Sequence, residues 1–120
     1  MNDIVLRVQD KFGRGPWRPG FSREWAEDRD ERENLLPCFV QFGIDLTTKA
    51  NPSLGRYFGC GCRTIEQLKR WFSANEYKTL LNLGYRAVRI DGTVIAESEI
   101  QVVLQRKIPL NERIDFVDLY

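Results

Sequence analysis

Two helix-start signals in series constrain the fold of this chain more than any other feature. Thr64 is followed three residues later by Gln67, and Ser73 by Glu76, which is the spacing of a capping box. Apolar residues at helical spacing follow both signals: Ile65, Leu68, Trp71 and Phe72, then Tyr77, Leu80 and Leu81. Gly84 ends the second pattern. The sequence therefore predicts two short consecutive helices, the first from Thr64 and the second from Ser73 to Gly84.

The remainder of the sequence predicts mainly strands and loops. Alternation of apolar and polar side chains predicts strands over 4–8, 37–43, 85–90, 93–96, 99–106 and 113–120, with a turn at Asp91-Gly92. Loops are expected over 11–20 and 47–55, and residues 27–33 are expected to form a solvated loop or a frayed helix. Ser22 is a candidate cap for a short helix. This order predicts one α+β domain over residues 1–120 with a mainly antiparallel sheet.

Charge and composition exclude several classes of function. The chain has 120 residues with 18 basic and 17 acidic side chains, so its net charge of +1 argues against a nucleic-acid partner. It has no apolar run long enough for a membrane helix and no signal-peptide pattern, so we expect a cytoplasmic protein without a membrane partner. Histidine is absent, which excludes Ser-His-Asp and Cys-His catalysis. Three cysteines are an odd number, and Cys60 and Cys62 are too close in sequence for an easy disulfide, so we expect reduced thiols. A structural zinc site needs four ligands and no histidine is present, so we expect no metal.

The first candidate site is the acidic segment 97–101. Residues two apart on a strand project from one face, so Glu97, Glu99 and Gln101 would lie side by side and suit acid–base chemistry or ribose recognition. The structural alternative is an exposed strand face or a bend between two strands.

Two further candidates lie near the N-terminus. Arg7 interrupts an apolar strand, where it either faces solvent or holds a phosphate or ribose. The glycine-rich stretch that follows offers cationic and stacking contacts through Arg14, Trp17 and Arg18, or is merely a structural loop.

Three segments resemble a known group of proteins. They are GRGPWRPGFS (13–22), FGCGCRTIEQLKRWF (58–72) and GYRAVRI with VIAESEIQVVLQR (84–106). Together they resemble small proteins carried by bacteriophages and prophages of proteobacteria. This resemblance implies a phage accessory protein that acts inside the host cell.

The layout is also similar, more distantly, to the core of mono-ADP-ribosyltransferases. The resemblance implies that Arg7 grips the phosphate and ribose side of NAD and that Thr64 supports the nicotinamide pocket. Glu97 and Glu99 match the carboxylate pair of the late strand, with Glu99 stabilising the oxocarbenium-like ribose. In another register Gln101 takes the place of the catalytic glutamate. The domain would then be a binding scaffold that has no ADP-ribosyl transfer activity.

Two hypotheses follow for the function. The first is a phage accessory protein that binds a host protein, with an anti-defence role such as anti-CRISPR included, through Trp17, Arg18 and Trp25 and the charge reversal around them. It needs no cofactor. The second is an NAD-dependent transferase that uses Arg7, Thr64, Glu97 and Glu99, with Arg14 as a further cofactor contact.

Overall fold

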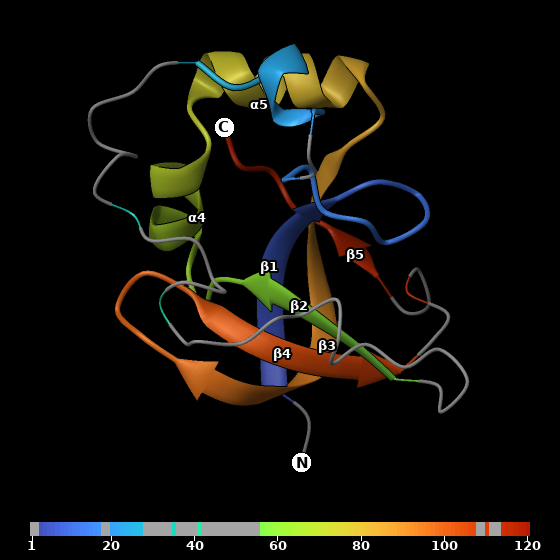
Figure 1. Cartoon of the computed structure of the whole chain (residues 1–120), viewed down its shortest axis with the longest axis vertical. Coiled ribbons are helices and arrows are strands. Elements are labelled where there is room, and N and C mark those ends of the chain that lie inside the picture. The colour runs from blue at the N-terminus through green and yellow to red at the C-terminus, as the bar shows by residue number, and fades with distance from the viewer. Residues whose placement is uncertain are drawn as a thin grey trace.

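The fold is that of a computed structural model, which describes residues 3–17, 20–27, 35, 41, 56–107, 110 and 114–120. The strands are β1 (Asp3–Gln9), β2 (Arg56–Gly61), β3 (Arg86–Glu97), β4 (Val102–Lys107) and β5 (Asp115–Phe116). The helical elements are a 3-10 turn, η1 (Ser22–Glu24), and the helices α4 (Ile65–Trp71) and α5 (Ala74–Asn82). The chain is thus an α+β domain with antiparallel strand pairing, as the sequence predicts (Figure 1).

The sheet curls and closes on itself. Its strand order is β1-β3-β4-β2, with β5 also paired to β3. Just after β2, the N–H groups of Leu6 and Cys62 each donate to the other residue's carbonyl, at 2.8 and 2.7 Å. This bridge joins the end of β2 to β1 and gives the curled sheet an inner and an outer face.

The helices form where the sequence predicts them. Thr64 and Ser73 both complete capping boxes, with Gln67 and Glu76 as their reciprocal partners. Gly84 ends α5 with a φ of 90°, a left-handed conformation that glycine adopts readily.

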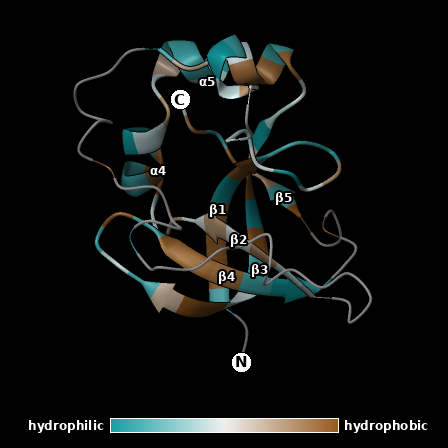
Figure 2. Cartoon of the chain, viewed as in Figure 1, coloured by the Kyte–Doolittle hydropathy of each residue, from teal (hydrophilic) through white to brown (hydrophobic). Residues whose placement is uncertain are grey.

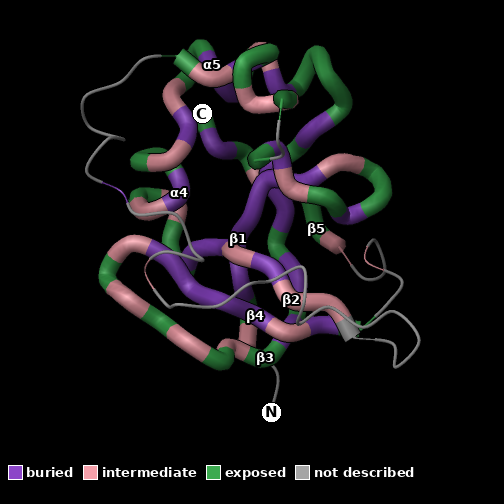
Figure 3. The backbone as a smooth tube through the Cα atoms, in the orientation of Figure 1, coloured by how far each residue is buried: buried purple, intermediate pink, exposed green. Residues whose placement is uncertain are grey.

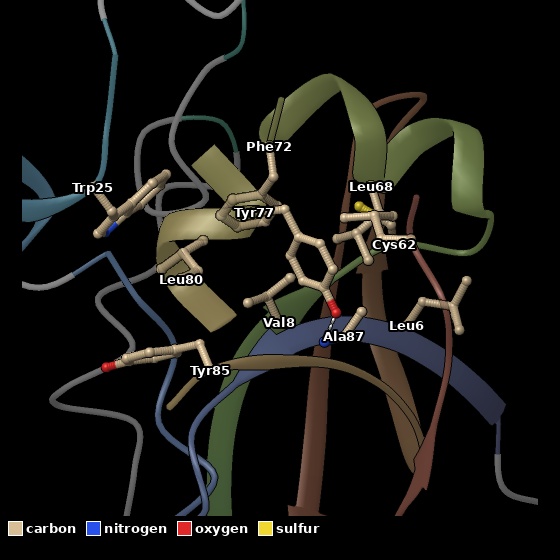
Figure 4. Packing of buried hydrophobic residues seen from close by; sticks show 11 residues of the cluster. Leu6, Val8, Trp25, Cys62, Leu68, Phe72, Tyr77, Leu80, Tyr85 and Ala87 are labelled. Carbon is tan, nitrogen blue, oxygen red and sulfur yellow. Dashed lines mark hydrogen bonds between the residues drawn. The ribbon is translucent and has the colours of Figure 1, made fainter. Parts of the chain in front are cut away.

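The outer face of the sheet packs against the helices and forms the larger core. Leu6 and Val8 of β1 meet Leu68 of α4 and Leu80 of α5 in this cluster (Figure 4). The Tyr77 hydroxyl also accepts a hydrogen bond from the backbone N–H of Ala87 at 2.9 Å. The core therefore fixes both helices to β1 and β3.

The inner face carries a second cluster of apolar side chains: Val5, Val88, Ile90, Val102 and Leu104. Hydrophobic residues accordingly colour much of β1 and β4 in Figure 2, and both strands are largely buried in Figure 3. Two glycines of β2, Gly59 and Gly61, line this face. A side chain at Gly61 would collide with Val5 and would lie 2.8 Å from the carbonyl oxygen of Leu6.

We expect Gly61→Ala to destabilise the fold by about 1–3 kcal/mol, because the added methyl group overpacks the closure between β2 and β1. Urea unfolding of the variant measures this loss. The double variant Gly61→Ala with Val5→Ala removes one of the two collisions, so the methyl group should cost less in a Val5→Ala background. An unchanged unfolding midpoint in Gly61→Ala would contradict this account of the closure.

Several sequence predictions need correction. The strands expected over 85–90 and 93–96 are one continuous strand, β3, and Asp91-Gly92 is not a turn. The last strand is shorter than expected, since β5 covers two residues. Phe21, not Ser22, precedes the 3-10 turn η1, and no side chain caps it.

Part of the predictions lies outside the described residues. This holds for the loop over 47–55, for nearly all of the segment 27–33, and for the strand over 37–43 except Gln41, which is helical. The loop over 11–20 is confirmed at its described positions.

Candidate functional site

The acidic segment 97–101 is a turn and not a strand face. β3 ends at Glu97 and β4 begins at Val102, so Glu99 and Gln101 lie in the connection between the two strands. This corrects the expectation of a strand from Glu99 and matches the alternative of a bend. The buried Gln101 side chain donates to Gln41 Oε1 at 2.9 Å.

The start of α4 holds this turn in place. Gln67 Nε2 donates to the Glu99 carbonyl at 2.9 Å, and Trp71 Nε1 donates to the Ile100 carbonyl at 3.1 Å. The hydroxyl of Thr64 accepts from the Gln67 N–H, as expected of a helix cap. The structure therefore brings Thr64 close to Glu99, with Gln67 between them.

Arg63 neutralises the first of the two glutamates. Its Nε and Nη2 donate to the Glu97 carboxylate at 2.8 and 3.2 Å, and its Nη1 donates to Asp3 at 3.3 Å. The hydrogen bonds from Arg63 lower the pKa of Glu97. The pKa of Asp3 is also lowered, first by the backbone N–H of Val94 and then by Arg63. Glu97 is thus an ion-pair partner at neutral pH.

These shifts predict a sensitivity to acid. Asp3 and Glu97 are more acidic in the folded than in the unfolded chain, whose ordinary pKa values are 3.8 and 4.5. The stability they contribute is complete above those values and is lost as the pH falls through the lower folded values. We expect Arg63→Met to flatten the decline of Tm below about pH 5. Identical pH slopes for the wild type and Arg63→Met would contradict this role.

Arg7 lies on the inner face of the sheet. It is 4% exposed, so it is not the solvent-facing residue that one sequence interpretation allowed. Its Nη1 donates to the Cys60 carbonyl at 2.9 Å and its Nη2 to the Gly13 carbonyl at 3.3 Å. Among the described residues no hydrogen bond or ion pair joins Arg7 to Glu97 or Glu99.

A second buried arginine, Arg106 of β4, meets Arg7 at the same carbonyl. Its Nη2 donates to the Gly13 carbonyl at 2.6 Å, and its Nη1 donates to Gln9 at 2.9 Å and to the Leu110 carbonyl at 3.1 Å. Burial, together with the nearby charge of Arg7, lowers the pKa of Arg106 to about 9. At neutral pH it therefore still carries its charge, so two guanidinium groups anchor Gly13.

Gly13 belongs to a tightly held segment, Asp10–Trp17, which we call the 10–17 loop (the blue loop after β1 in Figure 1). One carboxylate oxygen of Asp10 accepts the N–H groups of Phe12 and Arg14, both at 2.9 Å, and the other accepts Arg14 Nε at 3.0 Å. The Asp10 N–H donates to the Arg14 carbonyl at 2.9 Å. Gly13 has a φ of 84° and packs against Leu110. The loop backbone is thus held by Asp10 within the loop and by the two buried arginines of the sheet.

This loop presents large aromatic side chains to solvent. Phe12 is 57% exposed and has Lys11 and Arg14 each 5.1 Å from its ring. Trp17 is 47% exposed, and its ring packs edge-on against Trp25 at 4.6 Å. The exposed aromatic and basic side chains therefore project from a loop whose backbone is held by hydrogen bonds.

The other two residues expected at a partner interface differ from Trp17. Trp25 is 4% exposed and lies in the outer core, where its Nε1 donates to the Pro16 carbonyl at 3.2 Å. The Trp25 ring packs against the Trp17 ring, and its hydrogen bond to Pro16 holds the end of the 10–17 loop. Arg18 lies outside the described residues.

The comparisons with known proteins identify a family. A family model described as Bacteriophage T4 Y00F protein matches residues 1–113. The chain belongs to this family. No curated protein and no solved structure matches it. Membership in the Y00F family supports the expectation of a small phage protein, and none of the comparisons shows a similarity to ADP-ribosyltransferases.

Other expectations concern cysteines, metals and membranes. Cys60 of this Y00F-family chain is disulfide-bonded, which corrects the expectation of a reduced thiol there. Cys62 is free, and burial raises its pKa to about 12.

Within the described ranges no group of His, Cys, Asp and Glu is arranged to hold a metal ion. No helix there is long and apolar enough to cross a membrane.

Sequence reasoning missed three residues of the Y00F-family chain that shape these sites. Arg63 and Arg106 follow no motif, and their partners Asp3 and Gln9 are remote in sequence. Phe12 could have been found from the sequence, because it lies between Lys11 and Arg14 in a glycine-rich stretch, where a cation–π contact is expected. The geometry supports a surface for recognition better than a catalytic centre.

Proposed function

We propose that this protein is a phage accessory protein that binds a host protein through the 10–17 loop. The observation that carries the proposal is the exposure of Phe12 and Trp17 on a loop whose backbone is fixed by Asp10 and by two buried arginines. Membership in a bacteriophage protein family supports an action inside the infected host cell.

Aromatic and arginine side chains supply most of the binding energy at protein interfaces. A loop that is already ordered loses little conformational entropy when it binds, so more of that energy appears as affinity. Asp10, Arg7 and Arg106 hold the backbone of the loop. The Phe12 side chain is 57% exposed and that of Trp17 47% exposed, so part of each ring is accessible to a partner.

The charge on this surface indicates the chemistry of the partner. Lys11, Phe12 and Arg14 together form a cationic and aromatic patch. Such a patch fits a host surface that combines acidic and apolar side chains, because complementary charge guides encounter and register. A host defence protein is the specific target class that we propose, and its block by stoichiometric binding would be the anti-defence activity.

The alternative is an NAD-dependent ADP-ribosyltransferase. The proximity of Thr64, Glu97 and Glu99 around Gln67 and Arg63 favours a shared site at the start of α4. The residues fit NAD poorly, however, because Arg7 donates to two backbone carbonyls inside the sheet and the Thr64 hydroxyl already caps α4. Calorimetric titration of NAD into the wild type and Glu99→Gln tests this alternative directly.

Photo-crosslinking in infected host cells tests the binding proposal. A photoreactive phenylalanine is placed at Phe12, and in a matched control at Ile95, an apolar residue that is 45% exposed on β3. We expect a discrete host protein to crosslink at position 12 and not at position 95. If the two positions give the same pattern, or if only position 95 crosslinks, the 10–17 loop is not the interface.

A further inference from the structure

The strand β5 lies at an open edge of the sheet. It pairs with β3, whose opposite side pairs with β1 over the same residues. Among the described residues no further strand pairs with β5, and Figure 1 shows it as the short red arrow at one side of the sheet. Asp115 and Phe116 are both exposed. An exposed strand edge is a template for pairing with another chain.

The backbone groups of Phe116 point away from β3. The Val117 N–H donates to the Ala87 carbonyl at 3.1 Å. In an antiparallel ladder the backbone groups of successive residues point alternately toward and away from the partner strand, so those of Phe116, opposite Val88, face outward. No group in the described part of the chain is hydrogen-bonded to them on that side. One N–H and one carbonyl are therefore available to an added strand.

The side chain of Phe116 is also open to a partner. It is 61% exposed, and with Val88 and Ile114 it lines a pocket of about 450 Å³ on this face of the sheet. A residue directly opposite Phe116 on an added strand projects from the same face, with its Cβ about 5 Å away. Cross-strand pairs of aromatic and apolar side chains are favourable. This position therefore selects an apolar, and preferably aromatic, side chain.

Two charges of opposite sign flank Phe116. The Arg86 guanidinium stands over the Phe116 ring at 4.6 Å, and Asp118 is exposed two residues further along the chain. Neither forms an ion pair within the described residues. In an antiparallel added strand, a basic residue two positions before the aromatic one lies opposite Asp118, and an acidic residue two positions after it lies on the same face within reach of Arg86. The charges thus favour one chain direction.

We propose that β5 binds an extended segment of a partner protein as an added antiparallel strand. The segment carries an aromatic or large apolar residue opposite Phe116, a basic residue two positions before it and an acidic residue two positions after it. Backbone hydrogen bonds supply the affinity and alternate side chains supply the specificity, as in other complexes formed by strand addition. This surface is separate from the 10–17 loop, and the inference does not depend on the proposed host protein.

The test is a titration of the blocked pentapeptide acetyl-Lys-Thr-Phe-Thr-Glu-amide, followed by two-dimensional amide NMR. We expect saturable shifts of the Phe116 and Asp118 backbone amides. N-methylation of the peptide's phenylalanine removes the N–H that pairs with Phe116 and should weaken binding at least about fivefold. The peptide with lysine and glutamate exchanged has the same composition and should bind roughly two- to fivefold more weakly.

Asp118→Asn and Asp115→Asn form a matched pair of protein variants. Both aspartates are exposed, but Asp115 lies opposite Arg89 and projects from the other face of β5. We expect Asp118→Asn to weaken binding of the first peptide roughly twofold or more and Asp115→Asn to leave it unchanged.

Four results would overturn the proposal: no saturable shift with the protein folded, equal binding of the N-methylated peptide, equal binding of the exchanged peptide, and equal effects of Asp118→Asn and Asp115→Asn. A dimer in analytical ultracentrifugation that Phe116→Pro abolishes would assign the edge to a second copy of this chain and would also overturn it. Crosslinking at position 12 in host cells is read separately, so the failure of either proposal leaves the other intact.

Discussion

Leu68→Ala is expected to destabilise the protein by roughly 2–5 kcal/mol, as the cavity left by a fully buried leucine typically does. Leu68 is 2% exposed and lies between α4 and the outer face of the sheet. Leu6 and Leu80 belong to the same buried cluster, so truncation of Leu68 leaves a cavity inside a packed core. Urea unfolding at pH 7 measures the loss.

Leu81→Ala is the matched control for this prediction. It makes the same change in the adjacent helix, but Leu81 is 44% exposed. We expect it to change the free energy of unfolding by about 0.5 kcal/mol or less. A loss below about 1 kcal/mol for Leu68→Ala would show that the assigned face of α4 is not the buried one.

The helices were predictable because their signals are local. Each capping box lies within four consecutive residues, and the apolar stripe beside it needs no knowledge of distant strands. The first strand was predictable for a similar reason, since residues 4–8 lie within β1. Local sequence therefore accounts for the elements whose ends are fixed by their own side chains.

The course of β3 could not be predicted in this way. Asp-Gly is a frequent hairpin turn, and the sequence favoured two strands joined at Asp91-Gly92. In the structure this dipeptide lies where β3 passes from its pairing with β1 to its pairing with β4. A Cβ at Gly92 would lie 2.8 Å from Leu104 Cδ1, so the glycine serves the close approach of strands. Tertiary pairing overrode the local turn signal.

The candidate site was predictable only in part. Arg7 stood out as a charge in an apolar strand, but its direction depends on glycines of β2 and on a carbonyl of the following loop. Arg106 reaches the same carbonyl from the opposite end of the chain, and no spacing rule connects the two arginines. The 10–17 loop stands out in the sequence through its glycines, Arg14 and Trp17, whereas the hydrogen bonds that order it come from Arg7, Asp10 and Arg106 and depend on the fold.

The double variant Phe12→Ala with Trp17→Ala is expected to weaken host-protein binding by at least about 100-fold, because truncation of an aromatic hot spot typically costs about 2 kcal/mol or more and about 1.4 kcal/mol is a factor of ten. Both rings are about half exposed, so their removal leaves the Asp10 and Gly13 contacts of the loop in place. Trp17 also packs on Trp25, so thermal unfolding must accompany the binding measurement.

Asp10→Ala distinguishes the contribution of the ordered loop backbone to binding from the contribution of the aromatic side chains. It removes the acceptor of the Phe12 and Arg14 N–H groups but keeps both aromatic side chains. We expect weaker binding here too, with faster hydrogen exchange of the loop amides, because the partner must then order the loop itself.

The most direct test of the 10–17 loop as the interface is the affinity of the crosslinked host protein for four forms of this protein. They are the wild type, Phe12→Ala with Trp17→Ala, Asp10→Ala and Ile95→Ala, compared by calorimetry with each form shown to be folded. The loop account predicts wild-type affinity for Ile95→Ala, reduced affinity for Asp10→Ala and the largest loss for the double aromatic variant. Wild-type affinity of a folded double variant would contradict it.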